Sequence, residues 1–234
     1  MGLPVQKVPE YFCELPLSGL KVKFRPFLVG EQKTLLLMQE SEEQGLVFDA
    51  VQTLIKEVTF GDVKNVSKLP MADLEYLFLQ IRMKSIGESA DMNLICQNKE
   101  CGASNPISLD LNDVKLDTSN LPDKKIELSE DLGVIMRYPT ADLQKYADAN
   151  ESDAFIAILK SSIETIYDAE ETYDTIDYAD REMDEFLNSL SLQQVEKMGE
   201  FLNNTPTLSH IVRYKCVKCG HENSILLKGL ENFF

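Results

Sequence analysis

The sequence predicts an α+β protein that is mostly helical and consists of two similar halves, each with a strand, several helices and a β-hairpin. Two closely spaced cysteine pairs, Cys96 with Cys101 and Cys216 with Cys219, lie between apolar runs and precede a glycine, which indicates hairpin turns. Apolar residues at three- and four-residue spacing indicate amphipathic helices in much of the remaining chain. Both parts of the chain show these features in the same order, which favours an internal duplication.

The first half is expected to follow an extended N-terminal arm, residues 1–19, which contains three prolines. Residues 20–111 form this half. It begins with a strand at 20–26, because apolar and basic residues alternate there up to a proline. It ends in the two strands 92–96 and 107–111, which flank the first cysteine pair. Between them, periodic apolar positions bounded by glycine or proline predict three helices, at residues 31–41, 47–58 and 71–86.

The second half, residues 126–234, follows a polar stretch, residues 112–125, that is predicted to be a linker. It repeats the order of the first half and ends in a hairpin around the second cysteine pair. The alternative to a duplication is that the two halves share this order by coincidence. The predicted strands are residues 126–128, 134–138, 210–216 and 224–228, and the predicted helices are residues 141–148, 153–167, 181–187 and 192–201.

Four thiolates in two close pairs are the ligand set of one tetrahedral zinc ion. The first pair has four residues between its cysteines, the second has two, and 114 residues separate the two pairs. One Zn²⁺ held by Cys96, Cys101, Cys216 and Cys219 would therefore join two distant parts of the chain in a shared zinc ribbon. Its closed coordination would make it structural and not catalytic. Free structural thiols and disulfide or redox use are the alternatives, and His221 is a possible substitute ligand.

The composition argues against several classes of protein. The chain of 234 residues has 39 acidic and 23 basic residues, and its formal charge of −16 repels nucleic acid and anionic membranes. No apolar run approaches the ~20 residues of a membrane span, and Met1–Leu20 lacks the pattern of a signal peptide. Five cysteines with paired spacing in a chain that looks intracellular favour metal over disulfides. Cys13 is expected to be a half-buried small residue.

No group of residues suggests an enzyme or a site for a small-molecule substrate. The chain has only two histidines, His210 and His221, and it lacks a catalytic triad and a glycine-rich phosphate loop. The acidic residues 168–180, with interleaved tyrosines, form either a solvated surface loop or a contact for a basic partner. The terminal Phe233 and Phe234 are expected to pack back on the ribbon or to dock into a neighbouring subunit.

The segment Val22–Ser41 contains the motif Phe-Arg-Pro-Phe-Leu, followed by a lysine and a run of leucines. It resembles the opening of the T4-type bacteriophage baseplate proteins, a family linked to the central hub of contractile tails. The resemblance is strongest over residues 20–111 and vaguer in the second half, where residues 168–190 depart locally. It implies a non-enzymatic component of the baseplate hub or a factor that helps to assemble it. The implied partners are other baseplate and tail proteins, and the implied location is the virion tail or the host cytoplasm during assembly.

A zinc-ribbon regulator or nucleic-acid-binding module is the second hypothesis. The ribbon and the neighbouring basic residues Arg213, Lys215 and Lys218 favour this hypothesis, whereas the formal charge of −16 opposes it. The sequence therefore predicts a metal-stabilised protein that acts through contacts with other proteins and for which nucleic acid is a disfavoured partner.

Overall fold

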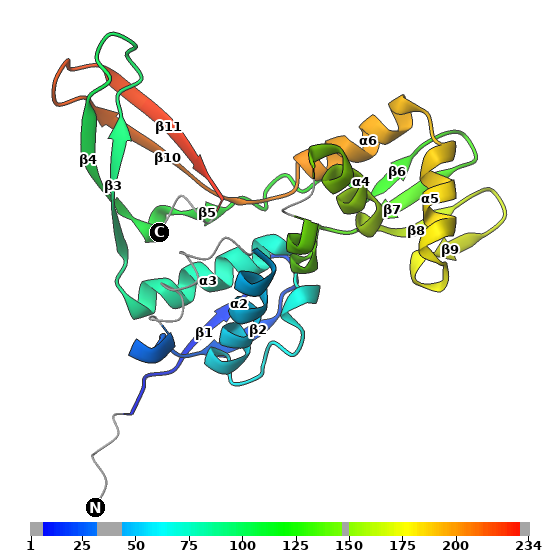
Figure 1. Ribbon diagram of the computed structural model, residues 1–234, viewed down its shortest axis with the longest axis horizontal. Helices are drawn as coiled ribbons and strands as arrows, with labels where there is room; N and C mark the ends of the chain where they lie inside the picture. Colours follow the sequence, from blue (N-terminus) through cyan, green and yellow to red (C-terminus); the bar gives the residue numbers. More distant parts are fainter. Residues whose placement is uncertain (1–6, 32–43, 147–149, 230–234) are drawn as a thin grey trace, which may run out of the picture.

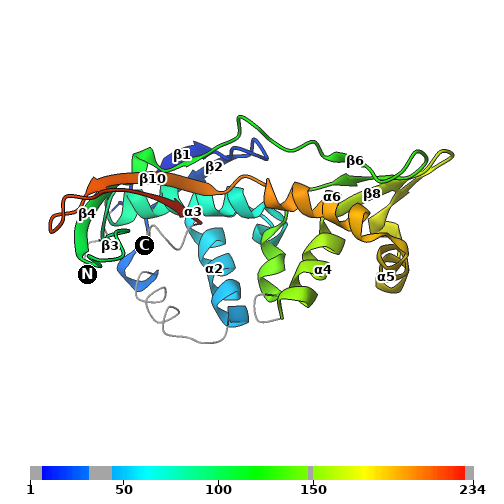
Figure 2. The same cartoon turned by 90° about the horizontal axis from the view of Figure 1, so that it is seen from above.

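The computed structural model describes residues 7–31, 44–146 and 150–229. It is an elongated molecule with two β-hairpins at one end and a four-stranded sheet with three helices at the other (Figures 1 and 2). Among the described residues, no helix has both the length and the apolar character needed to cross a membrane. The predicted helix at residues 31–41, apart from its first residue, and the C-terminal Phe233 and Phe234 lie outside the described residues.

Eleven strands in the described residues form four antiparallel sheets. Along the longer hairpins, residues that face inward alternate with exposed residues, as expected for a sheet with one covered face. The strands are β1 Tyr11–Glu14, β2 Lys21–Phe24, β3 Ser89–Ile95, β4 Ser104–Asp110, β5 Lys115–Leu116, β6 Lys125–Glu127, β7 Gly133–Met136, β8 Ile163–Tyr167, β9 Thr172–Asp174, β10 Leu208–Lys215 and β11 Glu222–Lys228.

The prediction of a mostly helical protein is wrong, because helix accounts for 36% of the chain and strands occur throughout the described residues. One cause is the helix predicted at residues 153–167. The observed helix ends at Ser162, and the chain continues as strand β8. The β8 sequence Ile-Glu-Thr-Ile-Tyr favours an extended backbone, and β8 pairs with β7. The described α-helices are α2 Gln44–Val58, α3 Met71–Ser85, α4 Glu151–Ser162, α5 Asp180–Ser189 and α6 Leu192–Asn203, and the 3₁₀-helices are η1 Val66–Lys68, η2 Leu111–Asp113, η3 Ala141–Tyr146 and η4 Thr175–Asp177.

The two halves of the chain are not the similar units that the sequence predicted. In the second half, β8 and β9 lie between α4 and α5, and they extend the β6–β7 pair to a four-stranded sheet. In the first half, the described residues before the β3–β4 hairpin form only the two-stranded sheet β1–β2. The extra pair includes β9, which lies within the acidic stretch 168–180 that was expected to be a loop. The difference therefore comes from strand pairing that the spacing of apolar residues did not reveal.

Buried apolar side chains form three clusters. The first lies among β1, β2, α2 and α3, and the third lies between the four-stranded sheet and helices α4, α5 and α6. The second cluster joins α3 to both cysteine-bearing hairpins, because Leu79 of α3 belongs to the same cluster as Leu109 of β4 and Val212 of β10. Burial of such side chains contributes about 1.5–3 kcal/mol each. The second cluster therefore holds the two hairpins against one helix.

Residues 112–125, predicted as a linker, contribute a strand to the second hairpin. Leu116 of β5 pairs with Leu208 of β10, and the sheet has the order β11-β10-β5. Val114, immediately before this strand, is buried in the second cluster. This stretch therefore fixes the base of the β10–β11 hairpin next to α3.

Candidate metal centre and family comparison

Each cysteine pair lies in a tight turn at the tip of a hairpin. In both turns the amide of the first cysteine, Cys96 or Cys216, donates a hydrogen bond to the carbonyl of the residue that follows the glycine, at 2.9 Å and 2.8 Å respectively. Gly102 and Gly220 have φ angles of +54° and +72°. Because residues with a Cβ rarely adopt this conformation, a glycine directly after the second cysteine lets the chain close the turn.

The four thiol sulfurs of Cys96, Cys101, Cys216 and Cys219 all lie within 4.8 Å of one another. The Cys96 and Cys219 sulfurs are 3.7 Å apart, and the Cys101 and Cys216 sulfurs are 3.8 Å apart. A tetrahedral site with Zn–S bonds of about 2.3 Å requires sulfur–sulfur distances of about 3.8 Å. A disulfide requires about 2.05 Å, and the four cysteines are free thiols. The donor set and its spacing therefore fit a four-coordinate thiolate metal site.

The thiols differ in their surroundings. Cys96 and Cys216 are buried, whereas Cys219 is exposed. Backbone N–H groups of Cys219 and Lys218 that point at the Cys216 sulfur lower the pKa of this thiol to about 6. Burial raises the pKa of the Cys96 thiol to about 11. A divalent cation would favour the thiolate form of all four groups, because ligand thiols bind deprotonated.

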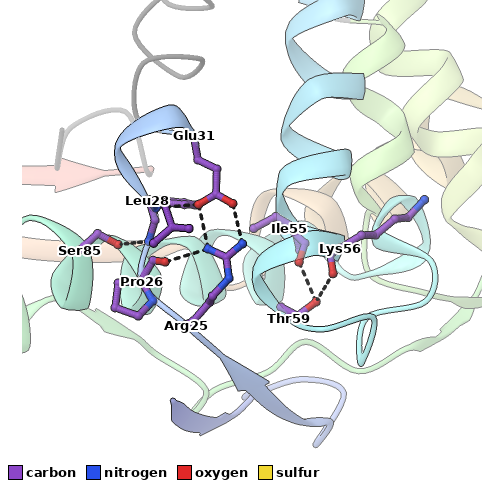
Figure 3. Close-up of polar contacts among 9 residues, drawn as sticks. Arg25, Pro26, Leu28, Glu31, Ile55, Lys56, Thr59 and Ser85 are labelled. Carbon is purple, nitrogen blue, oxygen red and sulfur yellow. Dashed lines mark hydrogen bonds and ion pairs between the residues drawn. The ribbon is translucent and has the colours of Figure 1, made fainter. Parts of the chain in front are cut away.

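The motif that carries the family resemblance forms a structural joint (Figure 3). The Arg25 guanidinium donates two hydrogen bonds to the Glu31 carboxylate, at 2.9 Å and 2.6 Å. The Leu28 amide donates to the same carboxylate at 2.7 Å, and the Phe27 amide donates to Ser85 Oγ of α3 at 2.8 Å. The contacts of Glu31 hold Arg25 and Leu28 together, and the Phe27 contact fastens this stretch to the end of α3. The motif therefore contributes to the fold and not to the cysteine cluster.

A comparison with protein-family models decides the relationship of this chain to known proteins. The model described as T4 bacteriophage base plate protein matches residues 8–234. The chain belongs to the T4 base plate protein family. The resemblance inferred from the Phe-Arg-Pro-Phe-Leu motif is thus confirmed. The chain is also 24% identical, over 225 residues, to the baseplate hub assembly protein gp26 of Enterobacteria phage T4, an alignment that covers 96% of this chain and 98% of that protein. No solved structure matches significantly.

Two other residues of this base plate protein were considered in the sequence, His221 and Cys13. Neither places its side chain in the sulfur cluster. The His221 side chain is exposed, and the group of possible metal ligands found among the described residues comprises the four cysteines without it. Cys13 lies in β1 beside the first cluster and is half-buried, as expected. Burial, together with the charge of Asp73, raises the pKa of the Cys13 thiol to about 11.

Sequence reasoning missed three asparagines around the centre. Asn98 Nδ2 donates to Cys219 Sγ at 3.9 Å, across the two hairpins. Asn105 and Asn223 are almost fully buried, with 1% and 3% of their surface exposed. A repeated Cys-Gly-x-x-Asn pattern, which begins at Cys101 and again at Cys219, is the signal that could have identified the buried pair.

The acidic stretch 168–180 is organised by its own contacts. The Asp168 carboxylate accepts hydrogen bonds from the amides of Glu170 and Glu171, at 2.9 Å and 2.8 Å, and from the Tyr173 hydroxyl at 2.9 Å. The hydrogen bond from the Tyr173 hydroxyl to Asp168 is the main reason that the pKa of Tyr173 rises to about 12. Asp168 therefore stabilises the turn between β8 and β9.

Proposed function

We propose that this member of the base plate family is a non-enzymatic protein of the phage tail baseplate that acts through contacts with other baseplate and tail proteins. The observation that carries the proposal is the alignment with the baseplate hub assembly protein gp26, which spans nearly the whole of both chains. Two roles are consistent with that relationship. The protein is either a component of the hub in the virion or a factor that acts in the host cytoplasm while the hub assembles.

Mass spectrometry of three samples tests this proposal: purified virions, isolated baseplate intermediates and the soluble fraction of infected cells. A fixed ratio to known tail proteins in virions supports a hub component. Presence in intermediates without presence in virions supports an assembly factor. Absence from both virions and intermediates contradicts a baseplate function. A tail protein of known copy number in the same samples provides the control for recovery.

We further propose that Cys96, Cys101, Cys216 and Cys219 bind one structural Zn²⁺. The sulfur separations of 3.7 Å and 3.8 Å support this proposal, as does the absence of a disulfide among the four. Zinc with four thiolates has no open coordination position, so it would contribute to folding and not to catalysis. The four cysteines would hold the ion, and the amides that point at Cys216 would stabilise the negative charge of its sulfur.

Elemental analysis of the purified full-length protein tests the zinc proposal. One zinc per chain is the expected result, because the cluster supplies one complete set of four ligands. Two zinc ions per chain, or none after purification in zinc-containing buffer without chelator, would contradict it. Iron in place of zinc would retain the ligand set and change the assigned metal, because a Cys₄ site also suits iron.

Exposed basic side chains of the second hairpin favour the alternative function, that of a zinc-ribbon regulator or nucleic-acid-binding module. Arg213, Lys215 and Lys218 are all exposed, and such a group can contact phosphates. The formal charge of −16 acts against it. A gel-shift experiment with duplex and single-stranded DNA at low salt distinguishes the two functions. The baseplate proposal predicts no shift, whereas binding that weakens steeply with added salt would favour the nucleic-acid module.

A further inference from the structure

Two buried asparagines connect the cysteine-bearing hairpins to each other. Asn105 is the second residue of β4, and Asn223 is the second residue of β11. Their side chains are 1% and 3% exposed. A buried amide side chain destabilises a protein unless its polar atoms are hydrogen-bonded, so the partners of these two groups show what they do.

The partners are arranged reciprocally. Asn105 Oδ1 accepts the backbone N–H of Val217, in the opposite turn, at 2.9 Å. Asn223 Oδ1 accepts the backbone N–H of Gln97, in the opposite turn, at 2.7 Å. Gln97 and Val217 each follow the first cysteine of their pair directly. Each asparagine therefore fixes the residue next to a thiol that belongs to the other hairpin.

The side-chain NH₂ group of each asparagine holds the turn of the hairpin to which that asparagine belongs. Asn105 Nδ2 donates to the Ala103 carbonyl at 2.9 Å, and Asn223 Nδ2 donates to the His221 carbonyl at 2.9 Å. These are the same carbonyls that accept the amides of Cys96 and Cys216. Because each Oδ1 faces an N–H donor and each Nδ2 faces a carbonyl, the hydrogen bonds determine the orientation of both side-chain amides.

Further contacts between the hairpins agree with this arrangement. The side chain of Gln97 accepts the Ser224 amide at 3.2 Å and donates to the Ser224 carbonyl at 3.3 Å. The Tyr214 hydroxyl donates to the Ile95 carbonyl at 2.9 Å. None of these contacts uses a sulfur atom or needs a metal ion.

We propose that Asn105 and Asn223 form a reciprocal clasp that joins the two hairpins and positions the four thiols before any metal binds. The inference deepens the proposed zinc site and depends on it only for the effect on metal affinity. The physical reason is that the side-chain oxygen of each asparagine accepts a hydrogen bond from a backbone amide in the turn of the other hairpin. Loss of an asparagine leaves that amide without its acceptor and frees the neighbouring cysteine to move.

Amide hydrogen exchange, measured by NMR on full-length metal-free protein under reducing conditions, tests the clasp. In the parent, the amides of Gln97 and Val217 should exchange slowly. Asn105→Ala should speed exchange at Val217, and Asn223→Ala should speed exchange at Gln97, each by at least about tenfold. The effect is crosswise, because each asparagine protects an amide of the other hairpin. Asn93→Ala, at an exposed position of β3, is the matched control and should change neither amide.

Two outcomes would overturn the proposal. Rapid exchange of both amides in the metal-free parent would mean that the metal, and not the asparagines, joins the turns. Equal loss of protection along both hairpins in each alanine variant would mean a general folding defect. Loss of protection confined to Val217 in Asn105→Ala and to Gln97 in Asn223→Ala would exclude that second case, because a general folding defect would not follow the two crosswise hydrogen bonds.

Metal affinity provides an independent measurement of positioning. Competition between the protein and a chromogenic zinc chelator should show affinity about 10–100-fold weaker in Asn105→Ala and Asn223→Ala than in the parent or Asn93→Ala, as expected for groups that orient ligands. Equal affinity in all four proteins would contradict a role in positioning the thiols. If the parent binds no zinc but the crosswise exchange pattern is present, the zinc proposal fails and the clasp stands.

Discussion

The sulfur atoms of Cys96 and Cys219 lie 3.7 Å apart, although the two residues are 123 positions apart in the chain. The contact joins the first cysteine of one hairpin to the second cysteine of the other, and Cys101 and Cys216 repeat this relationship at 3.8 Å. Neither hairpin therefore contains a complete ligand set. A metal bound here would close a loop of more than a hundred residues, which constrains the unfolded chain strongly.

Replacing Cys96 or Cys216 with serine should remove the bound zinc and destabilise both hairpins together. A structural zinc contributes roughly 10 kcal/mol or more, so we expect a loss of several kcal/mol, measured by thermal unfolding and limited proteolysis. Cys13→Ser is the control, since Cys13 lies in β1 outside the cluster. A Cys216→Ser variant as stable as the parent would show that the cluster does not stabilise the fold.

Thiol counting should give a large change on removal of the metal. In the zinc-bound protein, four of the five cysteines should be protected from a thiol reagent. Cys13 should react slowly, because it is half-buried and its raised pKa keeps it protonated at neutral pH. After treatment with a chelator and denaturation, all five should react. Five equally reactive thiols in the native protein before chelation would argue against metal ligation.

Glu31→Gln should destabilise the protein at neutral pH by about 1–3 kcal/mol, because the charged hydrogen bonds with Arg25 are lost. Burial alone would raise the pKa of Glu31, but hydrogen bonds from Arg25 and the Leu28 amide lower it below its ordinary value of 4.5. A lowered folded-state pKa stabilises the fold above 4.5, and this contribution disappears as the pH falls through the folded value.

Urea unfolding at neutral pH and in acid checks this prediction. The difference in stability between the parent and Glu31→Gln should shrink on acidification below 4.5. Glu14→Gln is the control, because Glu14 is exposed and its ion pair with Lys21 is 3.9 Å long. A difference that is the same at both pH values would show that the carboxylate charge of Glu31 is not what stabilises the joint.

Gly133→Ala should destabilise the four-stranded sheet by about 1–3 kcal/mol through overpacking. A Cβ at Gly133 would overlap the Tyr167 hydroxyl oxygen and would lie 2.8 Å from the Ile126 carbonyl oxygen. The tyrosine ring could move, but the backbone carbonyl is held by the pairing of β6 with β7. Circular dichroism during chemical unfolding measures the change. Gly30→Ala is the control, because a Cβ there meets nothing within 4 Å, and an equal effect at both positions would contradict this explanation.

The sequence was most informative where structure depends on neighbouring residues. The predicted helix at 71–86 corresponds to α3, and the strands on either side of each cysteine pair were placed within a few residues. Apolar periodicity and a glycine after a cysteine act over short distances, so they can be read directly from the chain. The Phe-Arg-Pro-Phe-Leu motif also indicated the family, although its function in forming a joint with Glu31 and Ser85 required the structure.

Sequence reasoning failed where a segment takes its conformation from a distant partner. Residues 163–167 continue the apolar spacing of α4, yet they form β8 because they pair with β7, about 30 residues earlier in the chain. The error made the protein seem more helical than it is, and it hid the strands that make the two halves different. Strand propensity is a weak guide when pairing partners are unknown.

By itself, the sequence determined the local parts of this base plate protein: two hairpin turns, each with a cysteine pair and a glycine that can take a positive φ. Only the tertiary structure decided that these turns meet, that the sulfurs of opposite hairpins pair crosswise, and that Asn105 and Asn223 each hold an amide of the other turn. The physical reason is distance along the chain. Turn geometry depends on a few adjacent residues, whereas these contacts join groups more than 110 residues apart, which α3 and the second cluster bring together.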